Sequence, residues 1–125
     1  METYPIKDND GFQHGFEIEV VYVSPKKISK ILSKVDGVTN IQNRKMFDMG
    51  NEIHIEFDFL GEKFVVWEPY GDSSRYWLCL KDKHSTSRPD ISRLEKAFVQ
   101  YNPPAIVRLF GDLISLNFKK LLKLN

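Results

Sequence analysis

The sequence has little cysteine, little net charge and no long apolar run, and each shortage excludes a class of protein. Cys79 is the only cysteine in 125 residues, which excludes an internal disulfide framework and a cysteine-rich zinc site. No apolar run reaches about 18 residues, the length that a transmembrane helix needs. Eighteen basic residues against seventeen acidic ones leave a net charge of +1, whereas general nucleic-acid binders are usually basic.

What remains is the composition of an ordinary globular domain. Apolar residues make up 42% and aromatic residues 13% of the chain, which is enough for a domain of this length to bury a core. The first five residues lack the basic-then-apolar pattern of a secretory signal. We therefore expect one cytoplasmic domain over residues 1–125, with residues 1–12 as a polar lead-in and no membrane association.

Alternation of apolar and polar side chains predicts strands. The pattern is clearest over Ile53–Phe59 and recurs at the start of Phe16–Val23, and Val38–Phe47 is a further strand candidate. Phe64–Trp67 is apolar on both faces, which favours a central position in the sheet. Tyr76–Leu80 completes an antiparallel meander with Ile53–Phe59 and Phe64–Trp67.

Apolar residues at helical spacing predict three helices. The first, residues 25–36, follows the good N-cap Ser24. The second follows Asp90, and the run Asn102-Pro103-Pro104 separates it from the third. Gly111 weakens the third helix by about 1 kcal/mol relative to Ala. We expect this helix to bury an apolar stripe against the domain, made of Ile106, Leu109, Phe110, Leu113, Leu116 and Leu121.

These elements predict an α+β fold. The expected order is β-α-β-β-β-α-α, with four to five strands in an antiparallel sheet and the helices packed on one of its faces. The opposite face of the sheet is then left for solvent or for a partner.

Charge is distributed unevenly over this layout. Residues 46–72 carry seven acidic residues and one lysine, whereas residues 22–45 carry six basic residues and one aspartate. Because side chains alternate along a strand, we expect an acidic sheet face that attracts a basic protein partner. The alternative is a solvated face that cross-strand Lys and Arg balance. The carboxylates on this face are Glu17, Glu19, Glu56 and Asp58.

The segment Glu68–Trp77 is dense in residue types that dominate protein interfaces, namely tyrosine, tryptophan and arginine. One interpretation is a recognition loop between two strands. The other is a structural corner, in which Arg75 pairs with Glu68 and the aromatic side chains pack in the core. In the first interpretation the partner-binding residues are Tyr70, Asp72, Arg75 and Trp77.

Residues for catalysis are sparse. The three histidines lie in separate segments, and the chain has no glycine-rich phosphate loop. His54, Glu56 and Asp58 alternate on one strand, but metal ligands normally converge from several elements. We therefore expect no catalytic residue, metal or cofactor. The alternative is a small enzyme that uses carboxylate and histidine chemistry around His54, Glu56, Glu68 and Asp72.

In size, composition, element order and charge segregation, the chain resembles the small single-domain immunity proteins of bacterial toxin systems. The segment Glu68–Trp77 looks like a family signature within that layout. The resemblance implies a cytoplasmic α+β inhibitor that blocks the catalytic domain of a cognate toxin by occlusion. The partner it implies is a basic toxin domain. Direct nucleic-acid binding is disfavoured because the acidic segments repel phosphates, and the sequence leaves monomer and homodimer open.

Overall fold

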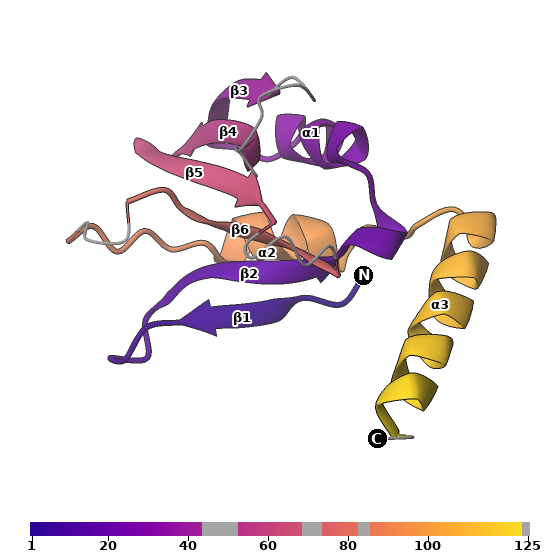
Figure 1. Ribbon diagram of the computed structural model, residues 1–125. Helices are drawn as coiled ribbons and strands as arrows, with labels where there is room; N and C mark the ends of the chain where they lie inside the picture. Colours follow the sequence, from indigo (N-terminus) through magenta and orange to yellow (C-terminus); the bar gives the residue numbers. More distant parts are fainter. Residues whose placement is uncertain (44–52, 69–73, 83–85, 124–125) are drawn as a thin grey trace.

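The computed structural model describes residues 1–43, 53–68, 74–82 and 86–123, and side chains up to residue 116. Within these residues the fold is α+β, as expected: one six-stranded antiparallel sheet and three α-helices (Figure 1). The sheet has the strand order β1-β2-β6-β5-β4-β3. The strands are β1 (Tyr4–Lys7), β2 (Gln13–Glu19), β3 (Val38–Asn43), β4 (Ile53–Phe59), β5 (Glu62–Trp67) and β6 (Arg75–Leu80). The helices are α1 (Pro25–Ser33), α2 (Ser92–Val99) and α3 (Ala105–Lys123), and η1 (Val20–Tyr22) is a short 3-10 helix.

The predicted meander is confirmed. Phe57 of β4 lies opposite Phe64 of β5, and Val66 of β5 lies opposite Leu78 of β6. β5 and β6 are the two central strands of the sheet. The central position of the doubly apolar Phe64–Trp67 segment is therefore confirmed as well.

The core lies between the sheet and the helices α1 and α2. Ile28 and Leu32 of α1 are fully buried, and the ring of Phe98 in α2 lies 5.5 Å from that of Phe16 in β2. α1 starts as the sequence predicts, because the Ser24 hydroxyl accepts a hydrogen bond from the Lys27 N–H at 3.2 Å. Apolar alternation in the strands and a helical apolar stripe thus bury the same core.

The N-terminal segment is more ordered than the polar lead-in that we expected. Residues 4–7 form the edge strand β1, in which Tyr4 lies opposite Glu17 and Pro5 opposite Phe16. An edge strand tolerates proline because its outer N–H groups need no partner strand. The predicted strand Phe16–Val23 ends early, since Val20–Tyr22 adopt the 3-10 conformation. β3 ends at Asn43, and the rest of the predicted strand Val38–Phe47 lies outside the described residues.

The expectation of a buried stripe on the third helix is wrong. α3 runs through Gly111 without interruption and stands beside the domain instead of covering the sheet (Figure 1). Its polar side faces the domain, so its apolar side is left outside. The exposed apolar side chains described on it are Ile106 (71%), Leu109 (62%), Phe110 (62%), Leu113 (51%), Ile114 (52%) and Leu116 (52%). Leu121 lies beyond the described side chains.

Candidate protein-binding face

Within the described residues, α1 and α2 pack on one face of the sheet only, and we call the other face the back face. The position of the back face follows from alternation, because in each strand the residues next to a back-face residue belong to the helix-side core. Cross-strand pairs confirm the assignment: Glu17 lies opposite Trp77, and Trp77 opposite Trp67. The back face consists of Glu17, Glu19, Glu56, Asp58, Lys63, Val65, Trp67, Arg75, Trp77, Cys79 and Lys81.

The four carboxylates predicted for one face do share the back face, but they do not form a bare acidic surface. Glu56 accepts a hydrogen bond from the Lys81 ammonium at 2.8 Å. Asp58 lies 3.4 Å from the Lys63 ammonium. Glu17 lies 3.7 Å from the Arg75 guanidinium. The expected acidic patch is therefore the balanced, cross-strand arrangement that we held as the alternative.

Exposure is unequal within these ion pairs. The Lys63 side chain is 67% exposed and that of Asp58 23%. Lys81 and Glu56 show the same order, at 45% and 11%. The carboxylates thus form an inner layer and the cations an outer one, so a partner that approaches the back face meets lysine ammonium groups first.

Asp58 shows how this layer is held. The Asn40 amide donates to its Oδ2 at 2.8 Å, and Lys63 adds a longer contact. The hydrogen bond from Asn40 and, secondarily, the charge of Lys63 lower the pKa of Asp58. Asn40 has a φ of 52°, in the left-handed region that asparagine tolerates better than most residues. The carboxylate therefore stays ionised in a fixed position.

A second cluster joins β1, β2 and β6. The Arg75 guanidinium stacks on the Tyr4 ring, 3.7 Å from its centroid. The Tyr4 hydroxyl lies 2.8 Å from Glu19 Oε1 and 3.0 Å from Glu2 Oε2. Burial and these two hydrogen bonds raise the pKa of Tyr4. Arg75 is thereby oriented on both sides, by an aromatic ring and by the carboxylate of Glu17.

Two tryptophans occupy the middle of the back face. The rings of Trp67 and Trp77 meet edge to face, with 5.9 Å between their centroids. Both residues are half-buried, so each keeps part of its surface outside. Tryptophan and arginine are the residue types most enriched among interface hot spots, and here Arg75 precedes Trp77 by two residues on the same face of β6.

The structure describes only part of the predicted recognition loop. Arg75 and Trp77 reach the back face, whereas Tyr76 is 7% exposed and belongs to the core. Tyr70 and Asp72 lie outside the described residues. The structural-corner interpretation pairs Arg75 with Glu68. In the structure Arg75 contacts Glu17, and Glu68 contacts His54.

Sequence reasoning missed several members of this surface. The sequence-based prediction leaves Lys63 between two strands, gives Trp67 only a place in a central strand, and includes Tyr4 in the polar lead-in. The signal was present in the alternation: Lys63, Val65 and Trp67 are two residues apart and share a face of β5. The alternation of Tyr4 and Ile6 in a segment of only four residues was too short to be decisive.

Of the residues of the enzyme alternative, His54 and Glu68 meet, whereas Glu56 lies on the other face of the sheet. His54 Nε2 lies 2.6 Å from Glu68 Oε1, and the His54 ring meets the edge of Tyr76 at 5.5 Å on the helix side. Glu56 contacts Lys81 on the back face. His54 does not share that face, because an irregularity between Ile53 and Ile55 offsets the alternation of β4. Asp72 lies outside the described residues. Burial and, secondarily, the charge of Glu68 raise the pKa of Tyr76.

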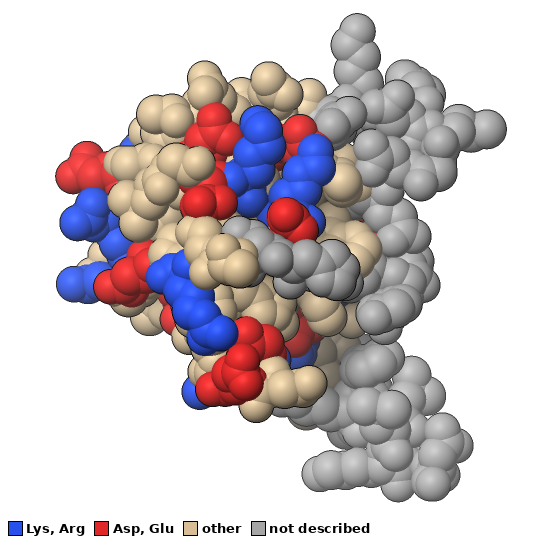
Figure 2. All heavy atoms as spheres, turned by 90° about the vertical axis from the view of Figure 1, so that its left-hand side faces the viewer, with Lys and Arg blue, Asp and Glu red and all other residues tan. Residues whose placement is uncertain are grey.

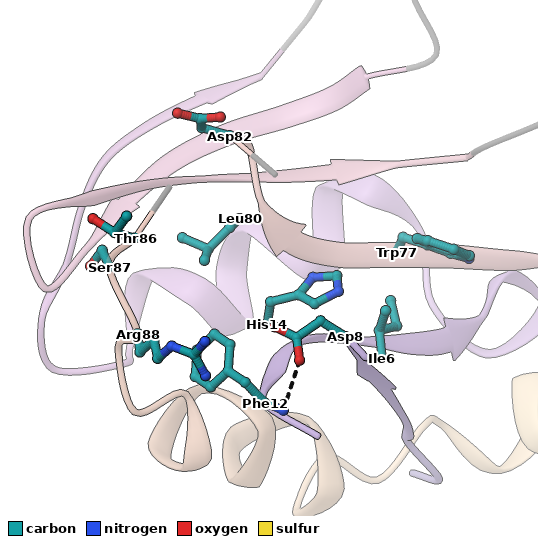
Figure 3. A pocket seen from close by; sticks show the side chains of 10 residues that line it. All are labelled: Ile6, Asp8, Phe12, His14, Trp77, Leu80, Asp82, Thr86, Ser87 and Arg88. Atoms are coloured by element: carbon teal, nitrogen blue, oxygen red, sulfur yellow. Dashed lines mark hydrogen bonds between the residues drawn. The ribbon is translucent and has the colours of Figure 1, made fainter. Parts of the chain in front are cut away.

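A cavity of about 490 Å³ lies where β1, β2 and β6 meet Asp82 and residues 86–88 (Figure 3). Two of its polar groups are engaged in structure. Asp8 accepts hydrogen bonds from the N–H groups of Asp10 and Phe12, at 2.9 and 3.0 Å. Arg88 lies over the Phe12 ring and 3.4 Å from Asp10. Neither His54 nor Glu68 lines this cavity. In the part of the chain that the structure describes, no three His, Cys, Asp or Glu residues are grouped as metal ligands.

At one end of the molecule, the charge segregation seen along the sequence is lost. Figure 2 looks onto the end of the molecule where the β1–β2 and β4–β5 turns lie, and there Lys and Arg are interleaved with Asp and Glu. The sheet brings oppositely charged segments into register, as Asp58 and Lys63 illustrate. A single large field of one sign is therefore absent from this end of the described structure.

Comparison of the chain with protein-family models, curated protein sequences and solved structures found no match. Among the described helices, none combines the length and the hydropathy required to cross a bilayer.

Proposed function

We propose that this protein is a small protein-binding module that recognises its partner through the back face and inhibits it by occlusion. One observation carries the proposal: the back face combines paired tryptophans, an oriented arginine and outward lysines, and α1 and α2 pack on the opposite face of the sheet. This combination of aromatic anchors and polar groups is typical of interfaces.

Inhibition by occlusion is supported by the kind of residues found, since the carboxylates and lysines of the back face pair with each other. Such a surface contributes shape and charge complementarity rather than chemistry. The immunity proteins of bacterial toxin systems, which the layout resembles, work in this way. The inhibited partner would be the enzymatic domain of a toxin.

The charge layering changes the partner that we expect. A purely basic toxin surface would meet the outer lysines first, and like charges at an interface are costly. A partner with carboxylates opposite Lys63, Lys81 and Arg75 fits better. The inner carboxylates then hold the three cations in place.

The alternative is a small enzyme that depends on the His54–Glu68 pair. A short contact between a histidine and a carboxylate is a common element of acid–base catalysis. However, Glu56 is directed to the opposite face of the sheet. The back face therefore provides the better-supported site.

The test compares two charge variants of the tagged full chain as bait in a lysate of the native host. The first, Lys63→Glu with Lys81→Gln, changes the outer layer of the back face while Gln can still donate to Glu56. The matched control, Lys26→Glu with Lys30→Gln, makes the same changes on exposed positions of α1. Recovery of the partner, quantified by mass spectrometry, should fall at least about tenfold for the first variant only, which corresponds to about 1.4 kcal/mol.

The captured protein is then purified and its enzymatic activity is measured with equimolar wild-type chain. Loss of that activity supports inhibition by occlusion. Equal capture by both variants would overturn the assignment of the back face. Capture without any effect on activity would overturn the inhibitor function.

A further inference from the structure

α3 presents an apolar surface that the back-face proposal does not use. Eight large apolar side chains are exposed in the described structure, and six of them lie on α3. These six are between 51% and 71% exposed. Isolated exposed apolar residues are ordinary, but a contiguous patch of this kind marks an interaction site.

The orientation of α3 is fixed by its polar side. The Tyr22 hydroxyl donates a hydrogen bond to Asp112 Oδ1 at 2.7 Å, and the Ser115 hydroxyl donates to Glu19 Oε2 at 3.3 Å. Gly111 is buried between these residues, and a Cβ there would overlap the Tyr22 ring. Rotating the apolar side of α3 onto its own domain would break all three contacts. In the described structure, that side of α3 is therefore left without cover from its own domain.

The exposed side chains of α3 indicate where cover is missing. A standard interface takes roughly 800 Å² from each partner, with an apolar centre and a polar rim. Six large apolar side chains, each more than half exposed, supply such a centre on α3.

The spacing on α3 fits pairing with an identical helix. Ile106, Leu109, Leu113 and Leu116 are separated by three, four and three residues, the repeat of a coiled-coil contact. The line from Ile106 to Leu116 extends over about 15 Å, and the next position of its repeat is Lys120. Charged side chains described on α3 lie off this line, with Asp112 bound to Tyr22. Over residues 106–116 the line is therefore without charge, and its repeat makes it complementary to itself.

The surroundings of α3 argue against a lipid surface. A crevice of about 230 Å³ separates α3 from the domain, and Glu2, Glu19 and Asp112 line it together with Arg108. Helices that lie on membranes direct a lysine- and arginine-rich side toward the headgroups. The polar side chains described on α3 face the domain, next to carboxylates that repel anionic lipids. Lys119, Lys120 and Lys123 of α3 lie beyond the described side chains.

We propose that two copies of this chain dimerise through α3, with Ile106, Leu109, Leu113 and Leu116 of each copy in the interface. Such an interface is isologous, with the same residues contributed by both copies. It uses other residues than the proposed inhibitor function, because the back face contributes none of these four, although Ser115 of α3 contacts the back-face residue Glu19. A dimer would present two back faces.

The test measures the molar mass of the purified full chain by light scattering over a roughly hundredfold range of concentration. The wild type should give twice 14.6 kDa at the upper end. Leu113→Glu should give a twofold lower mass with an unchanged circular dichroism spectrum per residue. Leu60→Glu is the matched control, since Leu60 is 52% and Leu113 51% exposed, and it should remain a dimer.

A wild-type mass of 14.6 kDa at every concentration would overturn the proposal, as would a dimer that survives Leu113→Glu. Vesicles of phosphatidylcholine and phosphatidylglycerol provide the second measurement. Co-sedimentation of a monomeric wild type with them, lost in Leu113→Glu, would assign the apolar side to lipid instead. None of these readouts needs the inhibited partner, so they stand apart from the test of the back face.

Discussion

α1 and α3 are both amphipathic, yet they use their two sides in opposite ways. α1 buries Ile28 and Leu32 against the sheet and leaves Lys26 and Lys30 exposed. α3 directs its polar side to the domain through Tyr22 and exposes its apolar side. Helical periodicity thus shows which residues share a side, but it does not show which molecule covers that side.

The difference follows from the positions that the loops allow. α1 follows η1 directly and returns across the strands, so its apolar side meets Phe57, Phe59 and Ile55 in one core. α3 follows the prolines at 103 and 104, after α1 and α2 already cover that face. The third helix packs on η1 rather than on the sheet, where Tyr22 lies against Gly111 of α3 and donates a hydrogen bond to Asp112.

The largest expected effect comes from removing one leucine side chain from each helix. Leu32→Ala creates a cavity in the core and should lower the free energy of unfolding by about 2–5 kcal/mol. Leu113→Ala removes a half-exposed side chain and should change it by no more than about 0.5 kcal/mol. Urea unfolding measures both, at a dilution where light scattering shows a single copy. A loss above about 2 kcal/mol for Leu113→Ala in the monomer would show that α3 packs on its own domain after all.

The sequence was sufficient for the parts of the fold that are decided by short-range patterns. Alternation over Ile53–Phe59 and the cap at Ser24 each specify an element whose cover is nearby in the chain. The sequence predicted only part of the back face. Ion pairs such as Glu56–Lys81, whose members are 25 residues apart, depend on the register between strands. The position of α3 could not be predicted from the sequence, because it depends on which face of the sheet α1 and α2 already cover.

A smaller effect is expected where α3 touches the domain. Gly111→Ala should favour the helix itself by about 1 kcal/mol. The added Cβ overlaps the Tyr22 ring, and overpacking costs typically about 1–3 kcal/mol. We therefore expect the contact between Tyr22 and Asp112 to open, with faster hydrogen exchange in η1. Unchanged exchange in η1 would mean that the ring moves aside without cost.

The start of α1 should be sensitive to a single hydroxyl. Ser24→Ala removes the acceptor for the Lys27 N–H and should cost about 1 kcal/mol in urea unfolding. Ser33→Ala is the control in the same helix: its hydroxyl donates to the Lys30 carbonyl at an exposed position, so the change should stay within about 0.5 kcal/mol. Equal losses for the two variants would show that the N-cap of α1 contributes no more to the free energy of unfolding than an exposed hydroxyl within the helix does.

The smallest effect should appear as a dependence on alkaline pH. Burial, and then the hydrogen bond to Asp112, raise the pKa of Tyr22 above its ordinary value of 10.0. A group whose pKa is raised on folding contributes its full stabilisation below the unfolded pKa and loses it as pH rises through the folded pKa. The attachment of α3 should therefore weaken above about pH 10, as seen in the fluorescence of a probe on α3. Tyr22→Phe lacks the titrating hydroxyl and should remove this transition while it also lacks the hydrogen bond at neutral pH. If the transition persists unchanged in Tyr22→Phe, another tyrosine controls it, and the contact between η1 and α3 is not what holds the helix with its apolar side outward.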